Sequence, residues 1–219
     1  MSSAGFARTG ILFVVSAPSG AGKTTLCDAL RQTPDFVYSV SCTTRPPRAS
    51  EIDGEDYQFI SETDFVARIE AGEFLEHAKV HDHRYGTLSE PIVADLQQGV
   101  DVLIDVDTQG AASIRNYNDP FIRDALCDVF IMPPDLDELR RRLTKRGTET
   151  SDQIELRLKT AAREMVLWRD YRYTIISKSI EEDLQKFRQI MGAERYLSRR
   201  LIEKSTLEGG ALSSAKDDG

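Results

Sequence analysis

Apolar runs alternate along the chain with segments of helical periodicity, and this alternation predicts an α/β fold. Residues 11–15 form a continuous β-branched and aromatic run closed by Pro, Ser and Gly, which is typical of a strand buried on both faces. Similar runs at 100–107, 128–132 and 173–177 predict further strands of the same sheet. Between and after them, helical patterns occupy 23–31 and 184–202. Strands that alternate with helices indicate a doubly wound parallel sheet.

Two segments, 41–90 and 136–168, interrupt this pattern and predict lobes placed on the sheet. The first follows a strand expected over 36–44 and combines a Pro-rich loop with short strands at 57–60 and 74–80 and a helix at 63–70. The second is basic and helical, with a capping box at Thr150 and Gln153.

The sequence therefore predicts one domain over 10–204, between a flexible N-terminus at 1–9 and a disordered tail at 205–219. The core of this domain comprises 10–40, 91–135 and 169–204, 41–90 forms a mixed α/β lobe, and 136–168 forms a helical lid.

Composition narrows the class of protein. Lys and Arg number 28 against 36 Asp and Glu, and the net charge of −8 argues against a nucleic-acid or anionic-membrane binder. No apolar run approaches the roughly 18 residues that span a bilayer, and the N-terminus does not resemble a secretory signal. Cys27, Cys42 and Cys127 are odd in number and scattered, which favours a reducing cytoplasm. A homo-oligomer is compatible with the sequence.

The strongest local motif is Ala17-Pro-Ser-Gly-Ala-Gly-Lys-Thr24, between the first strand and the first helix. Glycines let backbone N–H groups converge on phosphate oxygens, and the helix that follows adds the positive end of its dipole. Lys23 would reach the outer phosphates and the Thr24 hydroxyl would ligate Mg²⁺. Ala17 stands where the usual pattern has glycine. The residues expected to hold triphosphate oxygens are Ser19, Gly20, Ala21, Gly22, Lys23, Thr24 and Thr25.

Asp105 and Asp107 end the second apolar strand, at the sheet edge where such folds bind nucleotides. They are candidates for the metal, through water, and for the acceptor. The alternative for both is that they cap the end of the strand.

Five further blocks resemble the guanylate kinases, in that family's order and over about residues 11 to 200. They are Ser41-Cys-Thr-Thr-Arg-Pro-Pro-Arg-Ala-Ser-Glu-Ile-Asp-Gly-Glu-Asp-Tyr-Gln-Phe59, Gly72-Glu-Phe-Leu-Glu76, Tyr85-Gly-Thr87, Asp105-Val-Asp-Thr-Gln-Gly110 and Arg146-Gly-Thr-Glu-Thr150. The resemblance implies transfer of the ATP γ-phosphoryl group to GMP with Mg²⁺, so that 41–90 becomes a GMP-binding lobe.

The chemistry of these residues agrees with a guanine nucleotide acceptor. Arg45 and Arg48 offer planar donor forks for a phosphate, and tyrosine hydroxyls add neutral donors. Guanine presents two adjacent N–H donors that one carboxylate accepts, whereas adenine lacks them; the resemblance assigns this carboxylate to Glu76. The full set expected at GMP is Ser41, Arg45, Arg48, Tyr57, Glu76, Tyr85, Thr87, Asp105 and Asp107.

The basic segment 139–146 supplies cations for the transfer step. Arg142 and Arg146 lie one helical turn apart. The resemblance implies that these two and Arg157 close on the phosphates, with Arg45 on the other side, and the catalytic set is Lys23, Arg45, Arg142, Arg146 and Arg157. Ser177-Lys178 stands where the family usually has an asparagine that helps to hold the adenine ring. The sequence therefore does not predict selectivity for ATP over other triphosphates.

Two other classes of function compete with this interpretation. Guanylate-kinase-like scaffold modules would be expected to lack Lys23 and the lid arginines, which are present. A sugar-phosphate kinase would have no use for Glu76 with Thr87 and Asp107. The histidines at 77, 81 and 83 suggest a metal site, but a solvated loop is the favoured interpretation because acidic or thiol partners are missing around them.

Overall fold

The core of the protein is a five-stranded parallel sheet. The computed structural model describes residues 5–203 except 34, 81 and 148. The strands lie in the order β10-β9-β2-β8-β3, and every neighbouring pair is parallel, as the sequence predicts. Their bounds are β2 Leu12–Ser16, β3 Val37–Tyr38, β8 Val102–Asp105, β9 Leu126–Met132 and β10 Tyr173–Ile176.

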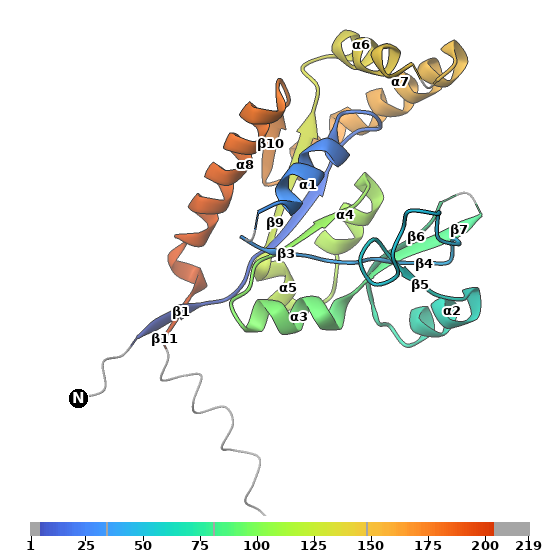
Figure 1. Ribbon diagram of the computed structural model, residues 1–219. Coiled ribbons are helices and arrows are strands. Elements are labelled where there is room, and N and C mark those ends of the chain that lie inside the picture. Colours follow the sequence, from blue (N-terminus) through green and yellow to red (C-terminus); the bar gives the residue numbers. More distant parts are fainter. Residues whose placement is uncertain (1–4, 34, 81, 148, 204–219) are drawn as a thin grey trace, which may run out of the picture.

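Helices cover both faces of this sheet because successive side chains of each strand point to opposite sides. Phe13 and Val15 of β2 pack with the apolar stripes of α1 (Lys23–Arg31) and α8 (Ile180–Arg195). Leu12 and Val14 pack on the other side, against α3 (Ser89–Gln97), α4 (Thr108–Arg115) and α5 (Pro120–Ala125). Figure 1 shows these two helical layers.

A second, mixed sheet forms the lobe over 41–90. Its order is β5-β4-β7-β6, with β4 Cys42–Thr43, β5 Gln58–Phe59, β6 Phe74–Val80 and β7 His83–Leu88, and it carries α2 (Glu62–Glu70). Cys42, Phe65 and Phe74 form a small core of its own, in which the two rings stack at 4.4 Å. The single strand expected over 36–44 is wrong: its first part belongs to the central sheet as β3 and its last part to the second sheet as β4.

The segment predicted to be a lid is a pair of helices, α6 (Leu136–Arg146) and α7 (Ser151–Met165), followed by a 3₁₀ turn, η1 (Val166–Asp170); the name lid is kept for it below. The predicted capping box is present: Gln153 N–H donates to Thr150 Oγ1 and Thr150 N–H donates to the Gln153 side chain. The two helices also bury a separate core, made of Leu139, Leu143, Ile154, Leu158 and Ala161.

The ends of the described chain pair with each other. β1 (Phe6–Arg8) forms an antiparallel ribbon with β11 (Leu201–Glu203), which follows the turn η2 (Ser198–Arg200), so part of the expected flexible 1–9 is a strand. The last helix ends at Arg195 rather than at 202. The fully buried Asp101 carboxylate pairs with Arg8 at 2.6 Å and Arg195 at 2.7 Å, joining both ends to the sheet. The expected tail at 205–219 lies outside the described residues.

Within the described part of the chain, no helix combines the length and the apolar character needed to cross a membrane.

Replacing Phe65 with alanine tests whether the second lobe depends on its own core. Phe65 is fully buried, and a Phe-to-Ala change at such a site costs about 3–5 kcal/mol of unfolding free energy. Urea denaturation measures this loss. Phe6→Ala is the control, because Phe6 is 64% exposed and its removal is expected to cost less than about 0.5 kcal/mol. Equal losses in the two variants would contradict the assignment of this core.

Candidate active site

The phosphate loop connects β2 to α1, at the carboxyl edge of the parallel sheet. Gly22 adopts a φ of 102° at the N-cap of α1, a conformation that L side chains rarely adopt. Gly20 has a φ of 82°, and a Cβ there would lie 2.7 Å from the Leu143 side chain in the lid. Both glycines are therefore required by the loop geometry, and the lid packs directly against the loop.

Lys23 reaches from the start of α1 to the end of β8. Its ammonium donates to the Val106 carbonyl at 2.8 Å and lies 3.4 Å from Asp105 Oδ2. Parallel pairing aligns Val15 of β2 with Asp105 of β8, so the residues that follow the two strands meet at one edge. The structure thus brings the predicted lysine and the predicted strand-end carboxylate together.

A buried carboxylate lies in a cleft next to this edge. Glu76 of β6 is 9% exposed and accepts a hydrogen bond from Thr87 Oγ1 at 2.7 Å, and Thr87 also lies 3.1 Å from Ser41 Oγ. Burial raises the pKa of the Glu76 carboxyl; the hydrogen bond from Thr87 opposes this, and the charge of Asp107 strengthens it. Glu76 Oε2 lies 3.1 Å from the position of a Cβ on Gly110, which keeps this side of the carboxylate tightly enclosed.

Asp107 has two roles. It is the N-cap of α4, where its Oδ1 accepts the Gly110 N–H at 2.7 Å, and it also lines the cleft of Glu76. The alternative interpretation was that this residue caps the end of a strand; the structure instead shows it as the cap of a helix, together with its position in the cleft.

The other end of the cleft gathers cationic and phenolic groups. The rings of Tyr57 and Tyr85 lie 6.0 Å apart, and the Arg45 guanidinium lies 5.6 Å from the Tyr57 ring. Arg45 donates twice to Glu51 at 2.9 Å, and these hydrogen bonds lower the pKa of the Glu51 carboxyl. Arg48 is also near this group: its side chain is 76% exposed, and its guanidinium lies 3.9 Å from Glu51.

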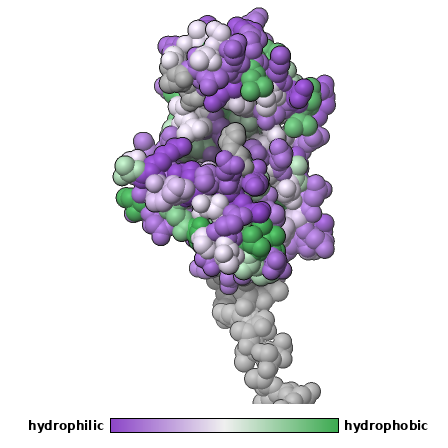
Figure 2. Space-filling view, turned by 90° about the vertical axis from the view of Figure 1, so that its right-hand side faces the viewer, coloured by the Kyte–Doolittle hydropathy of each residue, from purple (hydrophilic) through white to green (hydrophobic). Residues whose placement is uncertain are grey.

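Two cavities meet at Lys23 and Asp107, which line both. One, of about 210 Å³, is the cleft that contains Ser41, Tyr57, Glu76, Tyr85 and Asp105. The other, of about 320 Å³, follows the phosphate loop from Ala17 to Thr24. The face that carries the lid and the second lobe is mostly hydrophilic, and the molecule is narrower between these two parts than across either of them (Figure 2).

The predicted lid arginines are in different situations. Arg157 lines the phosphate-loop cavity and pairs with Glu149 at 3.2 Å. Arg142 instead donates to the carbonyls of Ala21 and Ser177 and to Ser177 Oγ, each at 3.1 Å. It thereby joins the lid to the loop and to the end of β10, beside a cavity of about 220 Å³ that Lys178 also lines. The side chain of Arg146 lies outside the described part of the structure.

Sequence reasoning missed two residues that contact the site. Glu164 of α7 accepts the backbone N–H of Ser19 at 2.8 Å, so a lid carboxylate lies where the loop would receive phosphate oxygen. Tyr38 of β3 donates to Asp105. Each contact joins residues far apart in the chain, and no local pattern marks either of them.

The side-chain oxygen atoms near Lys23 are of the kind that ligates Mg²⁺. Thr24 is exposed at the first turn of α1, and Asp105 and Asp107 lie at the neighbouring strand end. Magnesium sites in phosphoryl-transfer enzymes use one or two carboxylates together with substrate phosphates and water. Among the described residues, no three His, Cys, Asp or Glu side chains gather as a preformed metal cluster. His77 is exposed on β6, the strand predicted over 74–80, whereas His83 lies on β7 rather than in the expected loop. His81 lies outside the described residues.

Comparison with known proteins agrees with this arrangement. The family model "Guanylate kinase" matches residues 9–194. The chain belongs to the guanylate kinase family. It is 42% identical to the guanylate kinase of Caldanaerobacter subterraneus, over 86% of this chain and 89% of the relative. It is also 42% identical to that of Nitrobacter winogradskyi, over 90% and 88%.

A solved structure shows the same fold. The crystal structure of guanylate kinase from Anaplasma phagocytophilum matches with a TM-score of 0.72 and 31% identity, covering 98% of this chain and all of that one. The predicted family, kinase class and α/β P-loop fold are therefore confirmed.

Glu164→Gln tests whether the lid carboxylate competes with phosphate at the loop. The amide keeps an acceptor for the Ser19 N–H but removes a negative charge, so we expect a nucleoside triphosphate to bind about threefold to tenfold more tightly. Isothermal titration calorimetry measures this affinity. Glu155→Gln on the same helix, where Glu155 is exposed and paired with Arg140, is the charge-matched control and should change little. Unchanged or weaker binding in Glu164→Gln would contradict the competition.

Proposed function

We propose that this chain transfers the γ-phosphoryl group of ATP to GMP, with ATP on the phosphate loop and GMP in the cleft around Glu76. The observation that carries the proposal is the buried Glu76 carboxylate, set in a cleft that meets the phosphate loop at Lys23. The alternative acceptor, a sugar phosphate, has hydroxyl donors but lacks the planar pair of adjacent N–H donors that one carboxylate accepts in guanine.

Recognition of guanine follows from the acceptors of this cleft. The ring N–H and the exocyclic amine of guanine are adjacent donors, and Glu76 can accept both. Thr87 and Ser41 support this carboxylate on one side, while Asp107 adds a second acceptor nearby. Adenine lacks this pair of adjacent donors, so the acceptor positions of Glu76 that Thr87 does not fill would not both be satisfied, and such a mismatch discriminates by up to about 10⁴-fold.

The phosphate of GMP would bind between Arg45, Tyr57 and Tyr85. Arg45 is held in place by Glu51, and the tyrosines add neutral hydroxyl donors. The side chain of Arg48 is exposed on the same loop as Arg45, and it would join the phosphate site by turning inward. Because the acceptor oxygen is already anionic, the transfer needs alignment and charge neutralisation rather than a general base.

The lid cations would neutralise the transferred group. Arg157 already lines the phosphate-loop cavity, and Arg142 anchors α6 beside it. Arg146 completes the proposed set by resemblance to the family. Lys23 would exchange the Val106 carbonyl for phosphate oxygen, since its flexible ammonium is a mobile point charge.

Thr24, with Asp105 or Asp107 through water, would hold Mg²⁺. The ion, when bound, supplies charge neutralisation at the phosphates. The purine of ATP would lie by Ser177 and Lys178, where Ser177 is already bonded to Arg142. This arrangement predicts weak selectivity among donor bases.

The division into core, GMP-binding lobe and lid is part of the proposal, and the separate apolar clusters of the lobe and the lid support it. A cytoplasmic location is proposed as well, because all three cysteines are buried free thiols.

The experiment that tests the proposed function is a coupled assay of ADP release with ATP and Mg²⁺. We expect turnover with GMP and little or none with AMP, UMP or a sugar phosphate. Equal turnover with AMP would contradict the role of Glu76, and absence of turnover with GMP would refute the function.

Glu76→Gln should raise the KM for GMP about tenfold or more, because an amide cannot accept from both guanine donors. Steady-state kinetics measures this. Burial raises the pKa of Glu76 in the folded state, so its ionised form costs folding free energy at neutral pH. The Gln variant should thus be at least as stable as the wild type at pH 7, with the gain vanishing as acid protonates Glu76. A large loss of stability would show that Glu76 is a structural residue.

Arg157→Ala should lower kcat by about 10²-fold, because removal of one donor that stabilises the charge of the transition state typically has an effect of this size. The KM for GMP should change little. Arg163→Ala, an exposed arginine on the same helix, is the matched control and should retain wild-type rates. If both variants kept normal kcat values, the lid would not contribute Arg157 to catalysis.

A further inference from the structure

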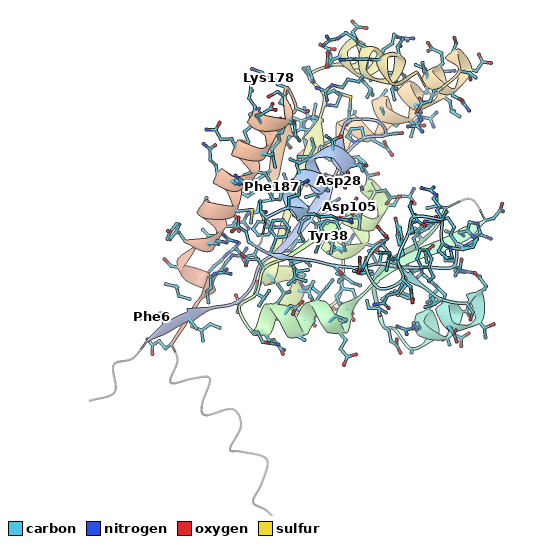
Figure 3. All side chains as sticks on the ribbon, in the orientation of Figure 1. Phe6, Asp28, Tyr38, Asp105, Lys178 and Phe187 are labelled. Atoms are coloured by element: carbon cyan, nitrogen blue, oxygen red, sulfur yellow. The ribbon has the colours of Figure 1, made fainter. Side chains whose placement is uncertain are left out.

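The hydroxyl of Tyr38 and the ammonium of Lys23 share the Asp105 carboxylate. Tyr38 donates to Asp105 Oδ1, while Oδ2 lies 3.4 Å from Lys23 Nζ. The two aspartate oxygens are therefore divided between a residue of the sheet edge and the lysine of the phosphate loop. In Figure 3 the labelled Tyr38 and Asp105 lie together at the centre of the molecule, beside α1.

Tyr38 is fixed from several sides. It lies on β3 opposite Leu103 of β8, so its side chain shares a sheet face with Leu103 and with Asp105 two residues further on. The Arg31 guanidinium lies over the ring, 3.7 Å from its centroid, and the ring packs against the core cluster of α1. Burial and the Asp105 charge raise the pKa of Tyr38, so the hydroxyl keeps its proton and remains a donor.

We infer that Tyr38 is a positioning residue for phosphoryl transfer: its hydroxyl fixes the plane of the Asp105 carboxylate so that Oδ2 alone faces Lys23. The terminal torsion of aspartate is broad, and nothing in its own backbone selects one orientation. Without the hydroxyl, both oxygens can turn toward Lys23, and a bidentate pair would hold the ammonium away from the phosphates.

The position of Tyr38 gives this contact a second consequence. β3 leads through Ser39 into Ser41 at the entrance of the acceptor lobe, and Tyr38, Ser41 and Asp105 line the same cleft. The hydrogen bond thus attaches the first residues of the acceptor side to the strand end that serves the donor side. The inference deepens the proposed function and rests on the assignment of Asp105 to the donor half of the site.

Tyr38→Phe removes the hydroxyl and keeps the ring. A hydrogen bond to a charged group typically contributes enough for about a tenfold effect or more, so kcat should fall about tenfold, with the KM for GMP within about twofold of wild type. A readout independent of turnover is the affinity for ATP, measured by calorimetry without GMP. We expect it to weaken about threefold to tenfold with Mg²⁺ present, and less with EDTA in its place.

Tyr173→Phe is the matched control. Tyr173 donates to the buried Glu194 carboxylate at 2.8 Å, a comparable hydroxyl–carboxylate bond outside the site. This variant should lose stability in urea without losing kcat or ATP affinity. If the two variants lose similar amounts of stability and also similar amounts of activity, the effect of Tyr38→Phe on activity follows from stability alone. Tyr38 would then be a structural residue and the inference would be overturned.

A double-mutant cycle with Asp105→Asn separates this inference from the proposed function. If Tyr38 acts through Asp105, adding Tyr38→Phe to Asp105→Asn should change kcat by less than about twofold, because the carboxylate that it orients is already gone. Additive effects would overturn the inference. An Asp105→Asn enzyme with normal kcat would instead refute the role of Asp105 itself, and a Tyr38→Phe enzyme with normal kcat and ATP affinity would overturn only the inference.

Discussion

The site depends on the parallel pairing of β2 with β8. Parallel strands bring their carboxyl ends to one edge, so the loop after β2 and the residues after β8 meet there whatever their distance in the chain. The same edge begins α1 at Lys23 and α4 at Asp107–Thr108, and both helices direct unpaired N–H groups and positive dipole ends toward it. An edge built in this way attracts anions before any side chain contributes.

Carboxylates of the protein itself already pair with the cationic groups around this edge, which opposes the attraction of external anions. Lys23 pairs with Asp105, Arg45 with Glu51, Arg142 with Glu138, and Arg157 with Glu149. A backbone N–H of the loop pairs with Glu164 in the same manner. In the proposed function, each of these carboxylates would keep its partner near the phosphates and would make an arriving anion compete with it. A doubly charged phosphate with several donors wins that competition more easily than a singly charged ion, which favours nucleotides over small anions.

Local pattern predicts most of this fold, and the failures have a common physical origin. The helix at Lys23–Arg31, the capping box at Thr150 and the buried strands follow from periodicity within a short window. The division of 36–44 into two strands was not predictable, because alternation within one run does not indicate which sheet each half joins. Likewise β7 reads His-Arg-Tyr-Gly-Thr-Leu, and its polar residues become strand only by pairing with β6. The contacts of Glu164 and Tyr38 span 145 and 67 residues and exist only in the folded chain.

The distribution of apolar cores determines what a movement of the lid would expose. The lid buries a small cluster that is separate from the two clusters of the central sheet, whereas the lobe has a small cluster of its own and also places Leu75 of β6 in one of the central clusters. Movement of the lid would therefore expose little of the main core, and its cost would fall on polar contacts at the edge of the lid. Two of these contacts differ in strength. Arg142 joins α6 to the phosphate loop and to the end of β10 through several hydrogen bonds, whereas Glu164 of α7 contacts the loop through one hydrogen bond, which a phosphate oxygen could replace. Motion about the Arg142 anchor would thus exchange a carboxylate at the loop for phosphate while keeping the lid attached to the sheet.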